Sequence, residues 1–235
     1  MAGALLGGFV SGLAGFGTGL VVLGIWLHVI PPALAAPLVI ICSVVSQSQT
    51  ISAVWHAIDL RCLWPMLLAG ILGVPLGVSL LSHVDPAAFR LGVGILLMLF
   101  STVMLTASTH PAFGWGGRKA DAVVGLCGGI LGGLSGLSGP LPTMWASLRG
   151  WSKDHRRGVF QAYNLTVLGT ALLVLAGQGL VTGEVGRLAL WALPGTLAGS
   201  WLGARAYRRL SDRHFHQIVL GLLAVSGITL IWPSL

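Results

Sequence analysis

Apolar segments follow one another along almost the whole of this 235-residue chain, with few charges inside them. Most have the roughly 20 residues that a helix needs to cross the hydrocarbon of a bilayer. Only 8% of the residues are charged, which is too few to cover a water-facing surface of ordinary size. The chain is therefore predicted to be an all-α polytopic membrane protein. We expect its eight hydrophobic segments at residues 4–30, 33–55, 62–82, 87–107, 120–148, 157–177, 185–206 and 215–232.

The formal net charge of +7 does not indicate a nucleic-acid partner. The 13 Lys and Arg residues lie in short loops between apolar segments, as the positive-inside rule describes for membrane proteins, so the lipid bilayer is the expected partner. The cysteines, Cys42, Cys62 and Cys127, lie far apart without CxxC spacing. We therefore expect no disulfide framework, no zinc site and no cofactor.

The two halves of the chain resemble each other. Residues 8–19 (GFVSGLAGFGTG) align without a gap with residues 129–140 (GILGGLSGLSGP). In a second match, Leu63, Trp64, Gly73 and Gly77 correspond to Leu190, Trp191, Gly199 and Gly203. We interpret residues 1–108 and 120–235 as two homologous four-segment repeats, with residues 109–119 as the linker. Such internal repeats underlie many secondary transporters.

The loop charges favour inverted copies of this repeat. If segments 1 and 5 break at their glycines and return to the side they entered, 11 of the 13 basic residues share one side, opposite Arg90 and Arg187. If all eight segments span, the copies are parallel and the split is nine to four. We expect the inverted arrangement, in the inner membrane, with both termini on the non-cytoplasmic side. The eleven are Arg61, Arg118, Lys119, Arg149, Lys153, Arg156, Arg157, Arg205, Arg208, Arg209 and Arg213.

The two glycine-rich stretches are the strongest candidates for a binding site. A helix broken at residues 15–19 would leave unpaired backbone N–H groups near the bilayer midplane, and such helix ends attract anions. In the second copy, Pro140 suits the first position of a helix. The alternative is that these glycines only let helices approach closely. The candidate residues here are Gly15, Gly17, Thr18, Gly19, Ser135, Ser138 and Gly139.

Polar residues inside segments 2 and 6 are the second set of candidates. Large amides cost more to bury without partners than hydroxyls do, and polar groups at membrane depth usually face a pathway. Hydrogen bonding between helices is the alternative. The amides that we expect to line a path are Gln47, Gln49, Gln161 and Asn164.

All six acidic residues lie at or beyond the ends of the segments, so none is available at membrane depth to relay protons or bind a cation. N–H groups, hydroxyls and amides suit a small oxyanion. The predicted function is a secondary transporter of a small anion, bound near the midplane between the repeats, with no enzymatic activity. A homodimer is left open. The acids are Asp59, Asp85, Asp121, Asp154, Glu184 and Asp212.

Three alternatives are weighed against an anion transporter. The first is a permease for another small solute or a metal ion. The second is an intramembrane enzyme using Cys42 or Cys127, which would need a base, and the sequence places no histidine deep in the membrane. The third is a structural membrane subunit, in which the polar residues only join helices.

The two glycine-rich stretches resemble those that open each half of the sulfite exporter TauE/SafE family. The stretches GILGVPLGVSLL and GTLAGSWLGARAY resemble the third and seventh segments of that family, so the likeness covers nearly the whole chain. The resemblance implies a membrane permease for sulfite or related organosulfur anions such as sulfonates and thiosulfate. The chain departs from the family in a short loop at residues 55–61 and in the stretches SQSQT and GVFQAYNLT.

Overall fold

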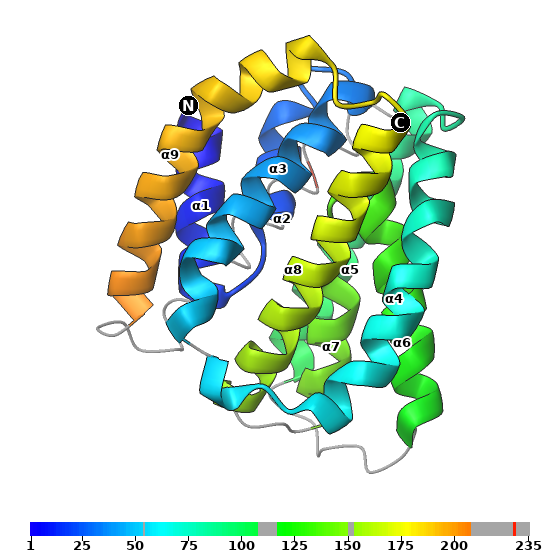
Figure 1. The fold of residues 1–235 in the computed structure, drawn as a ribbon, viewed down its shortest axis with the longest axis vertical. Coiled ribbons are helices and arrows are strands. Elements are labelled where there is room, and N and C mark those ends of the chain that lie inside the picture. The colour runs from blue at the N-terminus through cyan, green and yellow to red at the C-terminus, as the bar shows by residue number, and fades with distance from the viewer. Residues whose placement is uncertain (54, 108–116, 150–152, 208–227, 229–235) are drawn as a thin grey trace.

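In this computed structural model the chain is a bundle of α-helices (Figure 1), as predicted, and the structure describes all residues except 54, 108–116, 150–152, 208–227 and 229–235. The predicted segment at 215–232 lies outside the described residues, apart from position 228. The helices are α1 (Ala2–Ala14), α2 (Thr18–Trp26), α3 (Pro32–Thr50), α4 (Leu60–Leu81), α5 (Pro86–Ala107), α6 (Gly117–Ser135), α7 (Pro140–Leu148), α8 (Lys153–Gly177) and α9 (Gly183–Tyr207).

Four helices of the described part are long and apolar enough to cross a membrane, namely Pro32–Thr50, Leu60–Leu81, Pro86–Val103 and Arg157–Gly177. The outer faces of α4, α5 and α8 carry large apolar side chains. Leu72 is 71% exposed and Leu173 is 75% exposed. Contiguous apolar surface of this kind would promote association in water, whereas it suits contact with lipid tails.

The helix of segment 2 ends earlier than the sequence predicts, before the link between α3 and α4. Segment 2 is expected to reach residue 55, but α3 ends at Thr50 and two 3-10 turns follow, η1 (Ile51–Ala53) and η2 (Trp55–Ala57). The Thr50 hydroxyl donates back to the carbonyl oxygens of Ser46 and Gln47, which competes with continuation of the helix. Asp59 then caps α4, because its Oδ1 accepts from the Arg61 N–H at 2.8 Å. This bond holds the pKa of the Asp59 carboxyl below its usual range.

The predicted break in segment 1 is present, and the two parts form a hairpin. Helix α1 is closed by Gly15, which has a left-handed φ of 79° and donates its N–H to the Ser11 carbonyl at 2.7 Å. Gly7 of α1 lies against Val22 of α2, and Gly3 lies against Trp26. Helix α2 therefore runs back beside α1, and the two helices form a hairpin.

Segment 5 is built in the same way from α6 and α7. Helix α6 ends before Gly136, whose φ is 73°, close to that of Gly15. Gly132 of α6 lies against Ser138, and Gly128 lies against Pro142. Farther from the turn, Trp145 Nε1 donates to Asp121 Oδ1 at 2.8 Å, so α7 also runs back along α6. Helix α6 begins at Gly117, within the stretch predicted as a linker.

Each hairpin packs against a long helix from the other half of the chain, α1 on α9 and α6 on α4. Glycine makes these contacts close. A Cβ at Gly12 would lie 2.1 Å from the Ser200 carbonyl oxygen, and one at Gly133 would lie 2.4 Å from that of Val74. The interpretation of glycines as packing residues therefore holds for those within the helices. Homology and inversion of the two halves stay predictions.

Basic residues gather at one end of the bundle. The first turns of α4, α6 and α8 and the last turn of α9 lie toward the lower end in Figure 1, and α5 and α9 begin at the upper end. The lower helix ends carry Arg61, Arg118, Lys119 and Arg205, whereas Arg90 and Arg187 are the fifth residues of α5 and α9, which begin at the upper end. This distribution is the one that the re-entrant arrangement predicts.

Candidate anion-binding site

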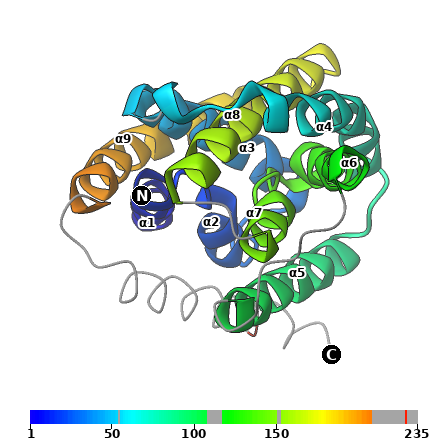
Figure 2. The ribbon, with the colours of Figure 1, turned by 90° about the horizontal axis from the view of Figure 1, so that it is seen from below.

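A small cavity lies where the two hairpins turn. The breaks that precede α2 and α7 form two of its walls, and α3 and α8 form the others. Figure 2 shows α2 and α7 in the middle of the bundle, between α5 on one side and α3 with α8 on the other. The cavity volume is about 10 Å³, room for a single water molecule. The lining residues are Phe16, Gly17, Thr18, Gly19, Leu20, Ser43, Gln47, Gly136, Leu137, Ser138, Gly139, Pro140, Asn164 and Leu168.

The first turn of α2 supplies backbone donors to this cavity. Its first intrahelical bond runs from the Val21 N–H to the Gly17 carbonyl, at 3.3 Å. The N–H groups of Thr18, Gly19 and Leu20 therefore have no acceptor within the helix. All three residues line the cavity. Together with the helix dipole, these groups favour negative charge at this point.

The first turn of α7 is poorer in donors, because two of its first three residues are proline. Helix α7 begins at Pro140, as predicted, and Pro142 follows two positions later. The first intrahelical bond is that of the Thr143 N–H to the Gly139 carbonyl, at 3.0 Å. Proline has no N–H, so Leu141 alone supplies an N–H from these three positions. The two helix starts therefore contribute unequally to the cavity.

Asn164 and Ser138 form a polar pair at the cavity wall. The Ser138 hydroxyl donates to Asn164 Oδ1 at 2.7 Å, and both residues are buried. Among the described residues Asn164 Nδ2 has no hydrogen-bond partner, although it is buried. A buried donor without an acceptor costs free energy, which an oxygen of a bound anion would recover. The pair thus orients the Asn164 amide with its donor available to a ligand.

Thr18 and Gln47 add two more polar groups without partners in the described part of the chain. Both residues are buried, Thr18 with 1% of its surface exposed and Gln47 with 2%. Neither Thr18 Oγ1 nor Gln47 Oε1 makes a hydrogen bond with the described residues. A half-turn of the Gln47 amide exchanges its oxygen for an NH₂ group, which would then donate to an anion.

Gln161 lies behind this cavity and serves as a link between helices. Its Nε2 donates to Thr50 Oγ1 at 2.5 Å and to the Gln47 carbonyl at 3.2 Å. The predicted residue Gly15 lies beside it, since a Cβ at Gly15 would be 3.4 Å from Gln161 Oε1. One turn earlier in α8, buried Arg157 donates from its NH2 nitrogen to the Gly12 carbonyl at 3.2 Å.

The structure brings most of the predicted site residues together and separates two from them. Gly17, Thr18, Gly19, Gln47, Ser138, Gly139 and Asn164 line the cavity, and Gly15 and Gln161 lie next to it. Gln49 is exposed on the outside of α3. The Ser135 hydroxyl donates to the Leu131 carbonyl of its own helix at 2.9 Å.

Sequence reasoning missed Ser43 at the cavity and the burial of Arg157. Helical spacing is the signal that could have found them. Ser43 precedes Gln47 by four residues on α3, so both lie on one face, whereas Gln49 does not share it. Arg157 likewise precedes Gln161 by four residues and Asn164 by seven on α8.

Among the residues that the structure describes, no acidic or basic one lines the cavity. Among the residues whose side chains are described, Asp121 is the acid that is buried. It lies in the second turn of α6, and its Oδ1 forms an ion pair with Arg149 NH1 at 2.8 Å. The local field at the cavity therefore comes from helix ends and polar side chains rather than from a fixed negative charge. Such a site favours an anion.

Comparison with known proteins agrees with this chemistry. The family profile described as "Sulfite exporter TauE/SafE" matches residues 1–230. The chain belongs to this family. A relative from Cupriavidus necator, named a probable sulfite/organosulfonate exporter TauE, is 27% identical over 243 residues, which cover 99% of this chain and 93% of the relative. No solved structure matches the chain.

Membership of the TauE/SafE family confirms the resemblance on which the sequence analysis relied. Proteins of this family are transporters, so this chain is a membrane transporter and not an enzyme. The family and the apolar helices together make it a multi-pass membrane protein.

Proposed function

We propose that this TauE/SafE protein is a secondary transporter of a small oxyanion, most directly sulfite or a related organosulfur anion such as a sulfonate or thiosulfate. The observation that carries the proposal is the cavity at the start of α2, which is lined by Asn164 and by three residues whose backbone N–H groups have no acceptor within the helix. The name of the Cupriavidus necator relative, a probable sulfite/organosulfonate exporter, supports this substrate class.

The donors of the cavity match the chemistry of such an anion. Sulfite and sulfonates present several oxygen atoms around one sulfur, and each oxygen accepts hydrogen bonds. Asn164 and Thr18 line the cavity together with the first residues of α2, and Asn164 Nδ2 and Thr18 Oγ1 have no hydrogen-bond partner among the described residues. A metal cation would instead need oxygen, nitrogen or sulfur ligands with negative charge nearby, and the lining residues carry none.

Transport requires the two hairpins to separate. A volume of about 10 Å³ is too small for an anion with four or more non-hydrogen atoms, so the substrate enters only when the walls move apart. We propose that the α1–α2 and α6–α7 hairpins shift relative to α3 and α8, each with the long helix on which it packs. Rocking of two bundles around a central site is a common means of alternating access.

The same proposal includes the orientation in the membrane. We propose that the end that carries Arg61, Arg118, Lys119 and Arg205 faces the cytoplasm, that the two halves are inverted repeats, and that both termini lie outside. The positive-inside rule and the return of both hairpins to the side they entered support it. An inner-membrane location follows from the same proposal.

Flux measurements test the function. Purified protein in proteoliposomes should move sulfite, thiosulfate or a short sulfonate down its gradient faster than empty vesicles do. Sulfate tests selectivity among oxyanions, and a divalent metal cation and a sugar serve as controls. Flux of the metal cation or the sugar, together with no flux of any oxyanion, would overturn the proposal.

A further inference from the structure

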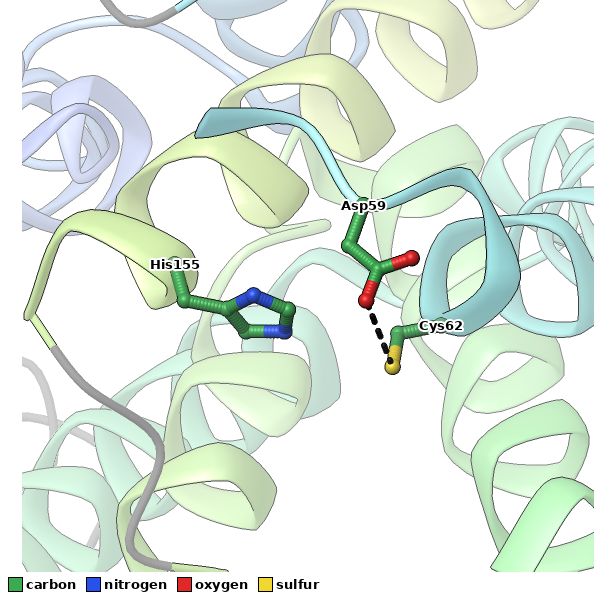
Figure 3. Close-up of side chains that lie close together, drawn as sticks. All are labelled: Asp59, Cys62 and His155. Carbon is green, nitrogen blue, oxygen red and sulfur yellow. Dashed lines mark hydrogen bonds between the residues drawn. The ribbon is translucent and has the colours of Figure 1, made fainter. Parts of the chain in front are cut away.

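Three side chains with metal-binding atoms lie together at the basic end of the bundle, away from the anion cavity. They are Asp59 and Cys62 at the start of α4 and His155 in the first turn of α8 (Figure 3). One ligand atom from each residue lies within 4.8 Å of the other two. The Cys62 thiol donates to Asp59 Oδ2 at 3.7 Å. In Figure 3 the imidazole ring points toward the carboxylate and the thiol.

The start of α4 holds two of these groups in place. Asp59 is the N-cap, and its Oδ1 is fixed by the bond from the Arg61 N–H. Its second oxygen, Oδ2, is the one that contacts Cys62, in the third position of the helix. Helix α8 packs against η2, just before this cap, and so brings His155 close. The cluster is therefore partly preorganised, which limits the ordering that a ligand would require.

We propose that Asp59, Cys62 and His155 form a zinc-binding site, with water completing the coordination. Thiolate, imidazole and carboxylate are the three side-chain ligands that Zn²⁺ uses in proteins, and an open fourth position occurs in sites with three protein ligands. In a tetrahedral Zn²⁺ site neighbouring ligand atoms lie about 3.5 Å apart, so the cluster needs to contract by about 1 Å. Ca²⁺ and Mg²⁺ favour oxygen ligands and fit this set poorly.

The surroundings allow an ion to reach the site. A cavity of about 570 Å³ adjoins it and is largely open, with Asp59, His155, His56 and Arg61 among its lining residues. Arg61 lies on the lining of this cavity, and its side chain is exposed, so solvent screens its repulsion of a metal ion. The thiolate and the carboxylate together offset the charge of a divalent ion.

This site differs from the sequence-based expectation that the chain has no zinc site. That expectation rested on the absence of CxxC spacing, whereas the cluster joins a short D-x-x-C pattern to a distant histidine. The ion would tie the first turn of α4 to the first turn of α8, and so one half of the chain to the other. It stands apart from the proposed anion site and does not depend on it.

Cobalt binding tests the zinc site, because Co²⁺ occupies zinc sites and gives a thiolate-to-cobalt charge-transfer absorption. The full chain, purified in detergent without a polyhistidine tag, should bind one equivalent of Co²⁺ with this absorption and release it to Zn²⁺. Cys62→Ser should abolish the absorption. His155→Ala and Asp59→Asn should weaken binding by at least about tenfold, since even outer-shell changes cost that much. Asn at position 59 still caps the helix, so the fold is kept.

Two matched variants control for nonspecific binding. Cys127→Ser removes an exposed cysteine on α6, and His83→Ala removes an exposed histidine at the opposite end. Both should bind Co²⁺ as the unmodified protein does. Gel filtration and thermal unfolding of each variant show that it is folded. No thiolate-to-cobalt absorption in the unmodified protein, its survival in Cys62→Ser, or unchanged affinity in both His155→Ala and Asp59→Asn would each overturn the proposal.

Discussion

At the residue scale, the cavity places polar groups where the protein itself does not satisfy them. Thr18 and Asn164 are each only 1% exposed. Even so, Thr18 Oγ1 and Asn164 Nδ2 have no hydrogen-bond partner among the described residues. Leaving such groups unpaired costs about 1–3 kcal/mol each. An anion bound at the proposed site would recover that cost by accepting hydrogen bonds from these groups. The Ser138 hydroxyl, by contrast, donates a hydrogen bond to Asn164 Oδ1 and so orients that amide.

Thr18→Val separates binding from stability at this site. Valine has nearly the same shape as threonine but no hydroxyl, so it removes an unsatisfied buried group and should leave the melting temperature unchanged or raise it. If the hydroxyl donates to the anion, affinity for sulfite should fall by roughly tenfold, because a hydrogen bond to a charged group contributes about 1.5–3 kcal/mol. Calorimetric titration and thermal unfolding of the same preparation measure both. A lower melting temperature with unchanged affinity would make Thr18 a structural residue.

The residue types of the site could be predicted from the sequence. Which side chains face the cavity could be seen only in the folded structure. Chemistry and depth in the membrane indicate the amides and glycines as site residues, and most of them meet at the cavity. The same grounds predict Gln49 and Gln47 alike, yet the two side chains lie on different faces of α3, and Gln49 is exposed. The contact between His155 and the Asp59–Cys62 pair could not be predicted, since it depends on how α8 packs beside η2.

At the scale of elements, the glycine-rich stretches have two structural roles. Gly15 and Gly136 end α1 and α6 in left-handed conformations, which allows each chain segment to turn back. Glycines within the helices let α1 approach α9 and α6 approach α4. The position of the breaks followed from the sequence, because glycine clusters of this density are rare inside helices. The partners of the hairpins did not, because they come from the other half of the chain.

Gly12→Ala tests the close helix contact. Its Cβ would lie 2.1 Å from a backbone carbonyl oxygen of α9, so the helices must move apart, and overpacking of this kind costs about 1–3 kcal/mol. Gly169→Ala on α8 is the matched control, because no described atom lies within 4 Å of its Cβ and alanine favours the helix by up to about 1 kcal/mol. Thermal unfolding followed by circular dichroism should show a lower melting temperature for the first variant and no decrease for the second. Equal stability of Gly12→Ala and the unmodified protein would contradict the contact.

At the scale of the whole molecule, the short helices α2 and α7 of the two hairpins lie in the middle, between α5 on one side and α3 with α8 on the other (Figure 2). The loop sequences predict that far more basic residues lie on one side of the molecule than on the other. In the described part, Arg61, Arg118, Lys119 and Arg205 lie at one end of the bundle, and Arg90 and Arg187 lie at the other. The sequence could therefore predict the class and the family, whereas the membrane sides of the loops stay a prediction. Relative placement of the halves depends on packing between distant segments, which periodicity does not encode.

Cysteine labelling tests the orientation of the molecule. In a background with Cys42, Cys62 and Cys127 changed to Ser, single cysteines replace the exposed residues His56, in η2, and His83, between α4 and α5. A membrane-impermeant maleimide should label position 83 in intact cells and position 56 only after permeabilisation. Labelling of both positions in intact cells, or of position 56 alone, would contradict the proposed orientation.

The most direct test of an anion site at the hairpin turns compares Asn164→Ala with Gln49→Ala. Both changes remove an amide from a polar run, but Asn164 lines the cavity and Gln49 is exposed. Sulfite affinity is measured by calorimetric titration of the folded, detergent-purified variants. Asn164→Ala should weaken binding about tenfold or more, because it removes a hydrogen bond to a charged ligand, and Gln49→Ala should bind as the unmodified protein does. Unchanged affinity in Asn164→Ala, or an equal loss in both variants, would contradict a site at this cavity.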